Sequence, residues 1–169
     1  AVLGDNMAVE FVPTTGKTRF TALASGEIDL LARNTTWTMS RDVDLKFEFI
    51  GVNYYDGQGF MVPASLGVST GAELDGATVC IQTGTTTELN LADFFRSNGI
   101  SYEPVPVETG SEAAQLFLAG SCDVYTTDRS ALAAQRANFP SPDDYVVLPE
   151  VVSKEPLGPL VRHGDNEWA

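Results

Sequence analysis

The chain has few of the residues that bind metals or nucleic acids. Its 169 residues include one histidine, His163, and two cysteines, Cys80 and Cys122, with no closely spaced cysteine pair. Lysine and arginine number 10 against 23 acidic residues, which gives a net charge of −13. Nucleic acids and anionic membrane surfaces attract basic faces, so this charge argues against both kinds of partner. Metal sites need clustered ligands, and we therefore expect no metal and no cofactor.

Long hydrophobic runs are also missing. No apolar stretch approaches the roughly 20 residues that a membrane-spanning helix requires. The chain has no starting methionine and no signal peptide at Ala1, so we expect a mature form or a fragment. With 43% hydrophobic and 20% charged residues, the composition is typical of a folded globular chain. The length suffices for one large domain or two small lobes.

The stretch from Gly26 to Arg41 changes abruptly from apolar to polar. Residues 28–32 are predicted to form a buried strand, and a polar loop follows. Polar groups directly after a strand are typical of a ligand site at the carboxyl edge of an open α/β sheet. Arg41 could supply paired donors that match a carboxylate. An exposed loop with an ordinary surface arginine is the alternative for this stretch alone.

A second stretch, residues 78–97, predicts a strand, a loop rich in glycine and threonine, and a helix over 89–97. The free amides and the dipole at a helix start favour an anion. No Gly-Lys-Ser/Thr follows the loop, so a carboxylate suits it better than a nucleotide. The alternative is a threonine N-cap with no ligand.

The remaining pattern alternates strands and helices. Strands are expected at 8–12, 60–63, 102–107, 122–126 and 158–161, helices at 17–25, 112–119 and 130–138, and extended segments at 145–148 and 151–152. A capping box starts the helix at Thr109, and a turn is expected at 54–59. Residues 23–30 resemble 118–124, each with a helix end, a glycine, an aspartate and a strand. We therefore expect two α/β halves, joined by 60–63 and 145–152, that face a ligand cleft.

Four segments resemble the extracytoplasmic solute-binding proteins of polar amino-acid ABC transporters, the family 3 type. They are LASGEIDLLARNTTWTMSRDVDLKFEF, ELDGATVCIQTGTTTELNLADFF, LAGSCDVYTTDRSAL and LPEVVSKEPLGPLVRHGDNEW. Within the family the chain is most similar to general L-amino-acid binders of the Aap type. The resemblance implies an α/β fold of the type II periplasmic-binding-protein kind, two lobes joined by a two-strand hinge. Lobe 1 would comprise residues 1–62 and 149–169, and lobe 2 residues 63–148.

The resemblance also implies how the two lobes share the ligand. Arg41 would hold the α-carboxylate from lobe 1, and Thr86 with the amides of the Gly84 loop would hold it from lobe 2. Asp128 would pair with the α-ammonium, while Asn34 and Thr36 would complete the ammonium shell. A cation, a helix start and a carboxylate are the groups that a zwitterion requires.

The implied function is uptake of L-amino acids from the periplasm, together with an ABC transporter permease in the inner membrane. A dehydratase-like enzyme on the same fold would need an acid or base over its substrate. No nucleophile–base pair is evident, so we expect no catalytic residues. A sensor or channel module would be marked by an adjacent membrane span, and the sequence has none. The groups above recognise only the common part of an amino acid. Side-chain specificity would come from residues such as Trp37 and Tyr55, for which plain packing is the alternative.

Family members begin with a strand, an aromatic-bearing loop and a helix before the position of Met7, and they continue as a helix after Trp168. The resemblance therefore implies an incomplete first lobe. Exposed strand edges recruit other chains, so we expect self-association through this lobe or loose packing within it.

The two cysteines permit a disulfide, which an exported chain would favour, and two buried thiols are the alternative. The family fold places the strands that bear Cys80 and Cys122 side by side. The resemblance therefore implies a Cys80–Cys122 disulfide in lobe 2.

Overall fold

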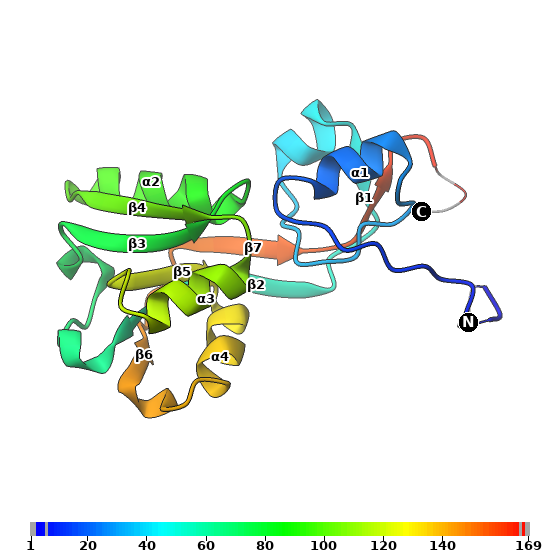
Figure 1. Cartoon of the computed structure of the whole chain (residues 1–169). Helices are drawn as coiled ribbons and strands as arrows, with labels where there is room; N and C mark the ends of the chain where they lie inside the picture. Colours follow the sequence, from blue (N-terminus) through cyan, green and yellow to red (C-terminus); the bar gives the residue numbers. More distant parts are fainter. Residues whose placement is uncertain (1–2, 6, 166, 168–169) are drawn as a thin grey trace.

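The computed structural model describes residues 3–5, 7–165 and 167, and it shows two bodies connected by two strands (Figure 1). The large body holds β3 (Ala77–Gln82), α2 (Thr86–Asn98), β4 (Tyr102–Val107), α3 (Gly110–Leu118), β5 (Val124–Asp128), α4 (Arg129–Ala137) and β6 (Tyr145–Val147). The small body holds α1 (Arg19–Ser25), β1 (Phe47–Phe49) and β8 (Leu160–Arg162). The connecting strands are β2 (Tyr54–Pro63) and β7 (Ser153–Leu157). Among the described residues, no helix has the length and apolar character to cross a membrane.

A six-stranded sheet forms the centre of the large body. Its order is β4-β3-β5-β2-β6, with β7 pairing to β2. The pairs β3–β4 and β3–β5 are parallel, while β2 runs antiparallel to β5, β6 and β7. The parallel pairs arise because α2 and α3 return the chain to the same end of the sheet. This confirms an α/β fold.

The sheet has an apolar core on each face. Successive strand residues point to opposite faces. Accordingly, Phe60 and Val62 pack with Leu91 and Phe95 of α2, while the intervening Met61 packs with α3 and α4 on the other face. A strand with apolar residues on both faces is typical of a sheet that helices cover on both sides.

The small body has a separate core of five buried residues: Leu23, Leu31, Phe47, Phe49 and Leu160. Its sheet is the antiparallel pair β1–β8, with Phe47 opposite Arg162. As expected, α1 ends at Gly26, which has a φ of 79° and donates to the helix carbonyls. A single π-helical turn, Ser40–Asp44, lies between α1 and β1.

Local sequence signals set the helix starts in the large body. Thr85 Oγ1 accepts from the amide of Glu88 at 3.2 Å, so α2 begins at Thr86, three residues before the predicted start. Thr109 Oγ1 accepts from the amide of Glu112 at 3.2 Å, and Glu112 accepts in return from the amide of Glu108 at 3.1 Å. The capping signal at Thr109 is therefore confirmed, with the returning bond one residue earlier than in the usual box.

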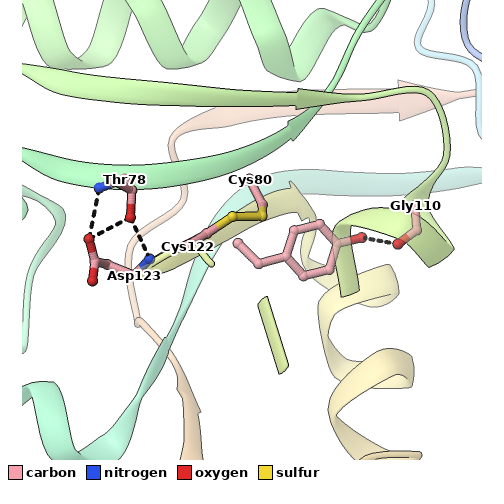
Figure 2. Close-up of a disulfide and its surroundings, with 6 residues drawn as sticks. Thr78, Cys80, Gly110, Cys122 and Asp123 are labelled. Carbon is pink, nitrogen blue, oxygen red and sulfur yellow. Dashed lines mark hydrogen bonds between the residues drawn. A yellow bond between two sulfur atoms is a disulfide. The ribbon is translucent and has the colours of Figure 1, made fainter. Parts of the chain in front are cut away.

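The disulfide between Cys80 and Cys122 is confirmed. Figure 2 shows the bond, which joins Cys80 of β3 to Cys122, two residues before β5. The two Cα atoms are 5.6 Å apart. Beside it, Thr78 and Asp123 exchange three hydrogen bonds of 2.6–2.9 Å. These bonds hold Asp123 in place, and β5 starts at Val124, two residues after the predicted start.

Two predicted strands are wrong. Residues 28–32 form only one β-bridge, in which Leu31 exchanges backbone bonds of 3.0 and 3.1 Å with Leu160. Of β8, only Leu160 pairs with this segment, whereas all three residues of β8 pair with β1. Residues 8–12 are irregular, and Val9 and Phe11 are exposed. An alternating pattern forms a strand only where a neighbouring strand and an apolar layer are available. The predicted helix end over 1–7 includes residues outside the described ones, and its described residues are not helical.

The predicted turn at 54–59 is also wrong, because these residues begin β2. Gly57 and Gly59 indicated a turn, but they serve close packing. A Cβ at Gly57 would lie 2.8 Å from the Ser153 carbonyl oxygen, and one at Gly59 would lie 2.8 Å from Cγ of Arg129. The segments that link the halves are consequently Tyr54–Gln58 paired with Ser153–Leu157, rather than 60–63 and 145–152.

Candidate functional site

The predicted site residues lie where the two bodies meet. Asn34 Nδ2 donates to Asp128 Oδ2 at 2.9 Å. The Thr36 and Thr86 hydroxyl oxygens are 3.3 Å apart, and NH1 of Arg41 donates to the Thr36 carbonyl at 2.7 Å. Asn34, Thr36 and Arg41 belong to the small body, while Thr86 begins α2 and Asp128 ends β5. Five of the six predicted ligand-binding residues are thus connected by hydrogen bonds.

The sixth predicted residue, Gly84, is on the rim of this arrangement. Its amide donates to Glu88 Oε2 at 2.9 Å, and a Cβ at this position would lie 3.2 Å from the Gly16 carbonyl. Its φ of 73° suits glycine. The structure therefore brings the loop to the joint between the bodies, but Glu88 uses the Gly84 amide.

Arg41 is buried, with 7% of its surface exposed. It lies on the π-helical turn, and its guanidinium carbon is 5.1 Å from the centre of the Phe20 ring. Burial lowers the pKa of Arg41, while the carboxylates of Glu155 and Asp128 raise it. A desolvated guanidinium binds an anion more strongly than one in water does, which suits the predicted carboxylate role.

Asp128 is a buried carboxylate, with 5% of its surface exposed. Burial raises the pKa of Asp128 to about 6; the hydrogen bond from Asn34 opposes this rise, and the charges of Asp56 and Glu155 add to it. Within the part of the chain that the structure describes, Asp128 makes no salt bridge. A buried carboxylate without a paired cation gains stability when an ammonium group reaches it.

Glu155 and Arg19 are two buried charges that the sequence analysis missed. Glu155, on β7, is 1% exposed and accepts hydrogen bonds from both Thr36 and Thr86. Arg19, on α1, is 2% exposed and donates from NH1 to the Asn34 carbonyl and to Thr35 Oγ1, each at 3.2 Å. Burial lowers the pKa of Arg19 to about 9, and the charge of Arg41 adds to this shift.

A weak sequence signal existed for both residues. Arg19 occupies the same helical face as Ala22 and Leu23, which are three and four positions later and buried. Glu155 alternates with Leu157, so it lies at a buried position of its strand. A charge on the buried face of an element is a useful marker of a site, because such charges need specific partners.

Two buried side-chain atoms have no hydrogen-bond partner among the described residues, and both lie at this joint. They are Nε of Arg19 and Oε1 of Gln58. Gln58 is opposite Asp128 in the β2–β5 pairing, and its amide group donates to the Thr87 carbonyl and to Thr126 Oγ1. Buried polar groups are nearly always paired, so these two unpaired atoms indicate that the joint can take up a polar ligand.

The aromatic residues proposed for specificity do not join these contacts. Trp37 stacks on Phe49 at 5.2 Å between ring centres, and its indole nitrogen donates to Asp42 at 2.9 Å. Tyr55 is 80% exposed on β2. The contacts of Trp37 therefore fit plain packing, which was the alternative interpretation of this residue.

The site residues contact one another directly instead of lining an open cleft. Two cavities, of about 460 and 290 Å³, lie within the large body and near its surface, and none of the six predicted residues lines them. The hydrogen bonds between Asn34 and Asp128 and between Thr36 and Glu155 connect the bodies instead. This arrangement corresponds to two bodies in a closed position.

Two α/β bodies joined by paired strands, with polar residues of both at the joint, define the type II class of periplasmic-binding-protein-like folds. The chain belongs to the bacterial extracellular solute-binding proteins, family 3, and the model of that family matches residues 2–169. The resemblance inferred from the sequence is thereby confirmed.

Named relatives agree with this assignment. The chain is 65% identical over 168 residues to the glutamate/glutamine/aspartate/asparagine-binding protein BztA of Rhodobacter capsulatus, covering 99% of this chain and 50% of BztA. It is 56% identical to the general L-amino acid-binding periplasmic protein AapJ of Rhizobium johnstonii, covering 99% of this chain and 49% of AapJ. The chain thus spans about half the length of these curated relatives.

A solved structure is also similar to this chain in fold and sequence. It is an ABC transporter/periplasmic binding protein from Brucella ovis with glutathione bound, and it has a TM-score of 0.92 and 53% identity. The match covers 98% of this chain and 52% of that chain. The similarity extends over both bodies, so the joint between them has the same overall setting in the two proteins.

Proposed function

We propose that this chain forms the ligand-contacting part of an extracytoplasmic solute-binding protein that binds L-amino acids for uptake by an ABC transporter. The main support is the set of bonds that joins buried polar groups of both bodies, Asn34 with Asp128 and Thr36 with Thr86. The amino-acid-binding names of its relatives add to this support. The transporter permease in the inner membrane is the proposed partner, and the periplasm is the proposed location.

The two bodies act as the two lobes of the binding protein. Lobe 1 comprises residues 1–53 and 158–169, and lobe 2 residues 59–152. These bounds differ from the expected 1–62 with 149–169 and 63–148, because the end of β2 packs within the large body. The paired strands β2 and β7 run between them and provide the hinge. A ligand held by both lobes favours the closed position, because its binding energy is available only when both sets of contacts form.

Each charged group of an amino acid has a matching group at the site. Arg41 binds the α-carboxylate, together with amides at the start of α2 near Gly84 and Thr86. Asp128 binds the α-ammonium, with Asn34 and Thr36 beside it.

The substrates include amino acids whose side chains carry an acid or an amide. Arg19 supports this choice, because its Nε is a buried donor that has no hydrogen-bond partner within the described part of the chain. The name of BztA, which lists glutamate, glutamine, aspartate and asparagine, agrees with it.

The protein binds its ligand without transforming it. The relatives are solute-binding proteins. His163 is exposed in the turn after β8, where its amide donates to the Lys46 carbonyl at 3.2 Å. The enzyme and sensor alternatives have no comparable support from the site.

A thermal-shift screen of the common L- and D-amino acids tests the proposed function. We expect the L-forms of acidic or amide amino acids to raise the melting temperature of the chain, and the D-forms to raise it less. Asp128→Asn tests the proposed site, and Asp123→Asn is its matched control, since Asp123 bonds to Thr78 away from the joint. Equal melting temperatures with and without every amino acid would contradict the proposal.

Binding should depend on pH through Asp128. Its pKa of about 6 lies above the ordinary value of 3.8, so its contribution to the stability of the ligand-free fold is lost as the pH rises through 6. The ionised form attracts the ligand ammonium, so we expect affinity to increase about tenfold between pH 5 and pH 7. Calorimetric titration at several pH values measures this change. Asp128→Asn should abolish it, and an unchanged profile in that variant would assign the effect to another group.

The small body should associate with a second copy of the chain. Exposed apolar side chains gather in its part of the sequence, including Met7, Phe11, Met39 and Val43. Apolar surface of this kind promotes contact between chains. Light scattering should detect a species larger than 18.1 kDa, and Phe11→Ser should reduce it more than Leu89→Ser on the large body.

We also expect faster amide exchange at 28–32 than in β3 and β5. A monodisperse monomer with uniform protection would show this prediction to be wrong.

A further inference from the structure

Glu155 lies at the centre of the contact between the bodies, and the roles proposed above do not use it. Oε2 of Glu155 accepts from the hydroxyls of Thr36 and Thr86, the latter at 2.9 Å. Oε1 accepts from Nδ2 of Asn90 at 2.8 Å and from the Ser153 hydroxyl. These four donors come from the small body, from α2 and from β7 itself.

All four donors to Glu155 are neutral, and they occupy both of its oxygens. A carboxylate only accepts hydrogen bonds and has about four acceptor positions. With its side chain 1% exposed and these positions filled, Glu155 has no capacity left for a ligand. Its influence on a ligand must therefore pass through the residues that it binds.

The two threonines transmit this influence through their hydroxyl hydrogens. A hydroxyl has one hydrogen to donate and two lone pairs. Thr36 and Thr86 both direct their hydrogen at Glu155, and their oxygens are 3.3 Å apart. Each hydroxyl is then left with lone pairs only. The pair can accept an N–H from a ligand, and it repels a ligand oxygen that has no hydrogen to donate.

We propose that Glu155 is a positioning residue that fixes Thr36 and Thr86 as hydrogen-bond acceptors and so extends the ammonium subsite of Asp128. This inference rests on the proposed function. It assigns the Thr86 hydroxyl to the ammonium side of the ligand and leaves the backbone amides of its loop to the carboxylate. Glu155 thereby makes the site select amino acids over 2-hydroxy acids of the same shape.

The proposal is tested by the ratio of two affinities, that for L-glutamate and that for (S)-2-hydroxyglutarate, both measured by calorimetry. The two probes share both carboxylates and differ in the α-substituent alone. An ammonium group donates several hydrogen bonds, whereas a hydroxyl donates one and brings lone pairs of its own. Wild-type chain should therefore bind L-glutamate more tightly. The ratio of the two affinities reports whether the Thr36 and Thr86 hydroxyls act as hydrogen-bond acceptors.

Glu155→Leu removes the acceptor and lets Thr36 and Thr86 donate to each other or to the ligand. We expect the ratio to fall about tenfold, the scale of one hydrogen bond to a charged group. Glu150→Leu is the matched control, since Glu150 accepts from the Gly71 amide and from neither threonine. It should leave the ratio within about twofold of wild type. Equal losses for both probes in Glu155→Leu would show a merely structural role and overturn the proposal.

A second variant keeps Glu155 and covers the case in which Glu155→Leu does not fold. Thr86→Val deletes one acceptor and retains the nearby charge. Its loss should be larger for L-glutamate than for (S)-2-hydroxyglutarate. A proportional loss for both probes would remove the Thr86 hydroxyl from the ammonium subsite and contradict the inference.

The ligand-free chain gives an independent readout. Hydroxyl hydrogens held by a buried carboxylate exchange slowly with water, so NMR should detect those of Thr36 and Thr86 in wild type and lose them in Glu155→Leu. Fast exchange of both hydrogens in wild type would overturn the role of Glu155. A chain that binds neither probe would contradict the proposed function instead, and the hydroxyl exchange would still decide how Glu155 orients the threonines.

Discussion

Replacing Cys80 and Cys122 together by alanine should lower the free energy of unfolding by about 4 kcal/mol in the chain-entropy account of disulfides. The bond joins residues 42 positions apart and encloses α2, β4 and α3. Without it, the unfolded chain gains the freedom of this whole loop. Urea denaturation monitored by circular dichroism measures the change as a lower midpoint of unfolding.

The same protein supplies the control for this experiment. Wild-type chain under reducing conditions should show a similar loss, because it lacks the bond but keeps both buried sulfur atoms. Cys80 lies within β3 and Cys122 precedes β5, whereas Thr86 follows β3 and Asp128 ends β5. We therefore expect amino-acid affinity well below the melting temperature to stay the same. Two free thiols in denatured, unreduced protein, or equal midpoints for wild type and variant, would contradict the prediction.

Arg41→Lys should weaken amino-acid binding by about 1–3 kcal/mol, the scale of a charge-assisted hydrogen bond. The guanidinium presents several donors in one plane, and one of them already bonds to the Thr36 carbonyl at 2.7 Å. Lysine keeps the charge but has no planar fork, so it cannot hold the Thr36 carbonyl and a carboxylate in the same geometry. Calorimetric titration reports the loss as a higher Kd.

Arg96→Lys is the matched control, because Arg96 is exposed on α2 and pairs with Asp93. We expect its affinity to equal that of wild type, since exposed ion pairs contribute little. Equal affinities for wild type and Arg41→Lys would remove Arg41 from the carboxylate subsite.

Local patterns predicted most of the large body. The strand β4 has the predicted bounds, β3 begins one residue earlier than predicted, and the capping threonines before α2 and α3 have their expected bonds. These features depend on neighbours in the sequence. The Cys80–Cys122 pairing came from the family resemblance, because the contact of β3 with the start of β5 is a property of the tertiary fold.

Errors arose where distant residues decide the structure. Residues 28–32 are mostly apolar, like a buried strand, but the available partner, β8, offers one bridge. Gly57 and Gly59 resemble turn residues until Ser153 and Arg129 are seen against them. These local patterns therefore failed because tertiary packing overrides local propensity.

The site divides in the same way. Arg41 was expected from the polar loop that bears it, and Asn34, Thr36, Thr86 and Asp128 from the family resemblance; hydrogen bonds link Asn34 to Asp128 and Thr36 to both Thr86 and Arg41. Glu155 meets Thr36 across 119 sequence positions, and no local pattern indicates that contact. Sequence reasoning finds the groups that a motif displays, whereas the buried charges that orient them need the fold.

The most direct test of amino-acid binding at this joint uses Asp128. Wild type and Asp128→Asn are titrated by calorimetry with the amino acid that gives the largest thermal shift and with its deaminated analogue, and Asp123→Asn is the control. Asp128→Asn should lose about tenfold or more in affinity for the amino acid and about twofold or less for the analogue, because only the amino acid has an ammonium group to pair. Equal losses for the two ligands, or an amino acid that binds Asp128→Asn as tightly as wild type, would contradict the site described here.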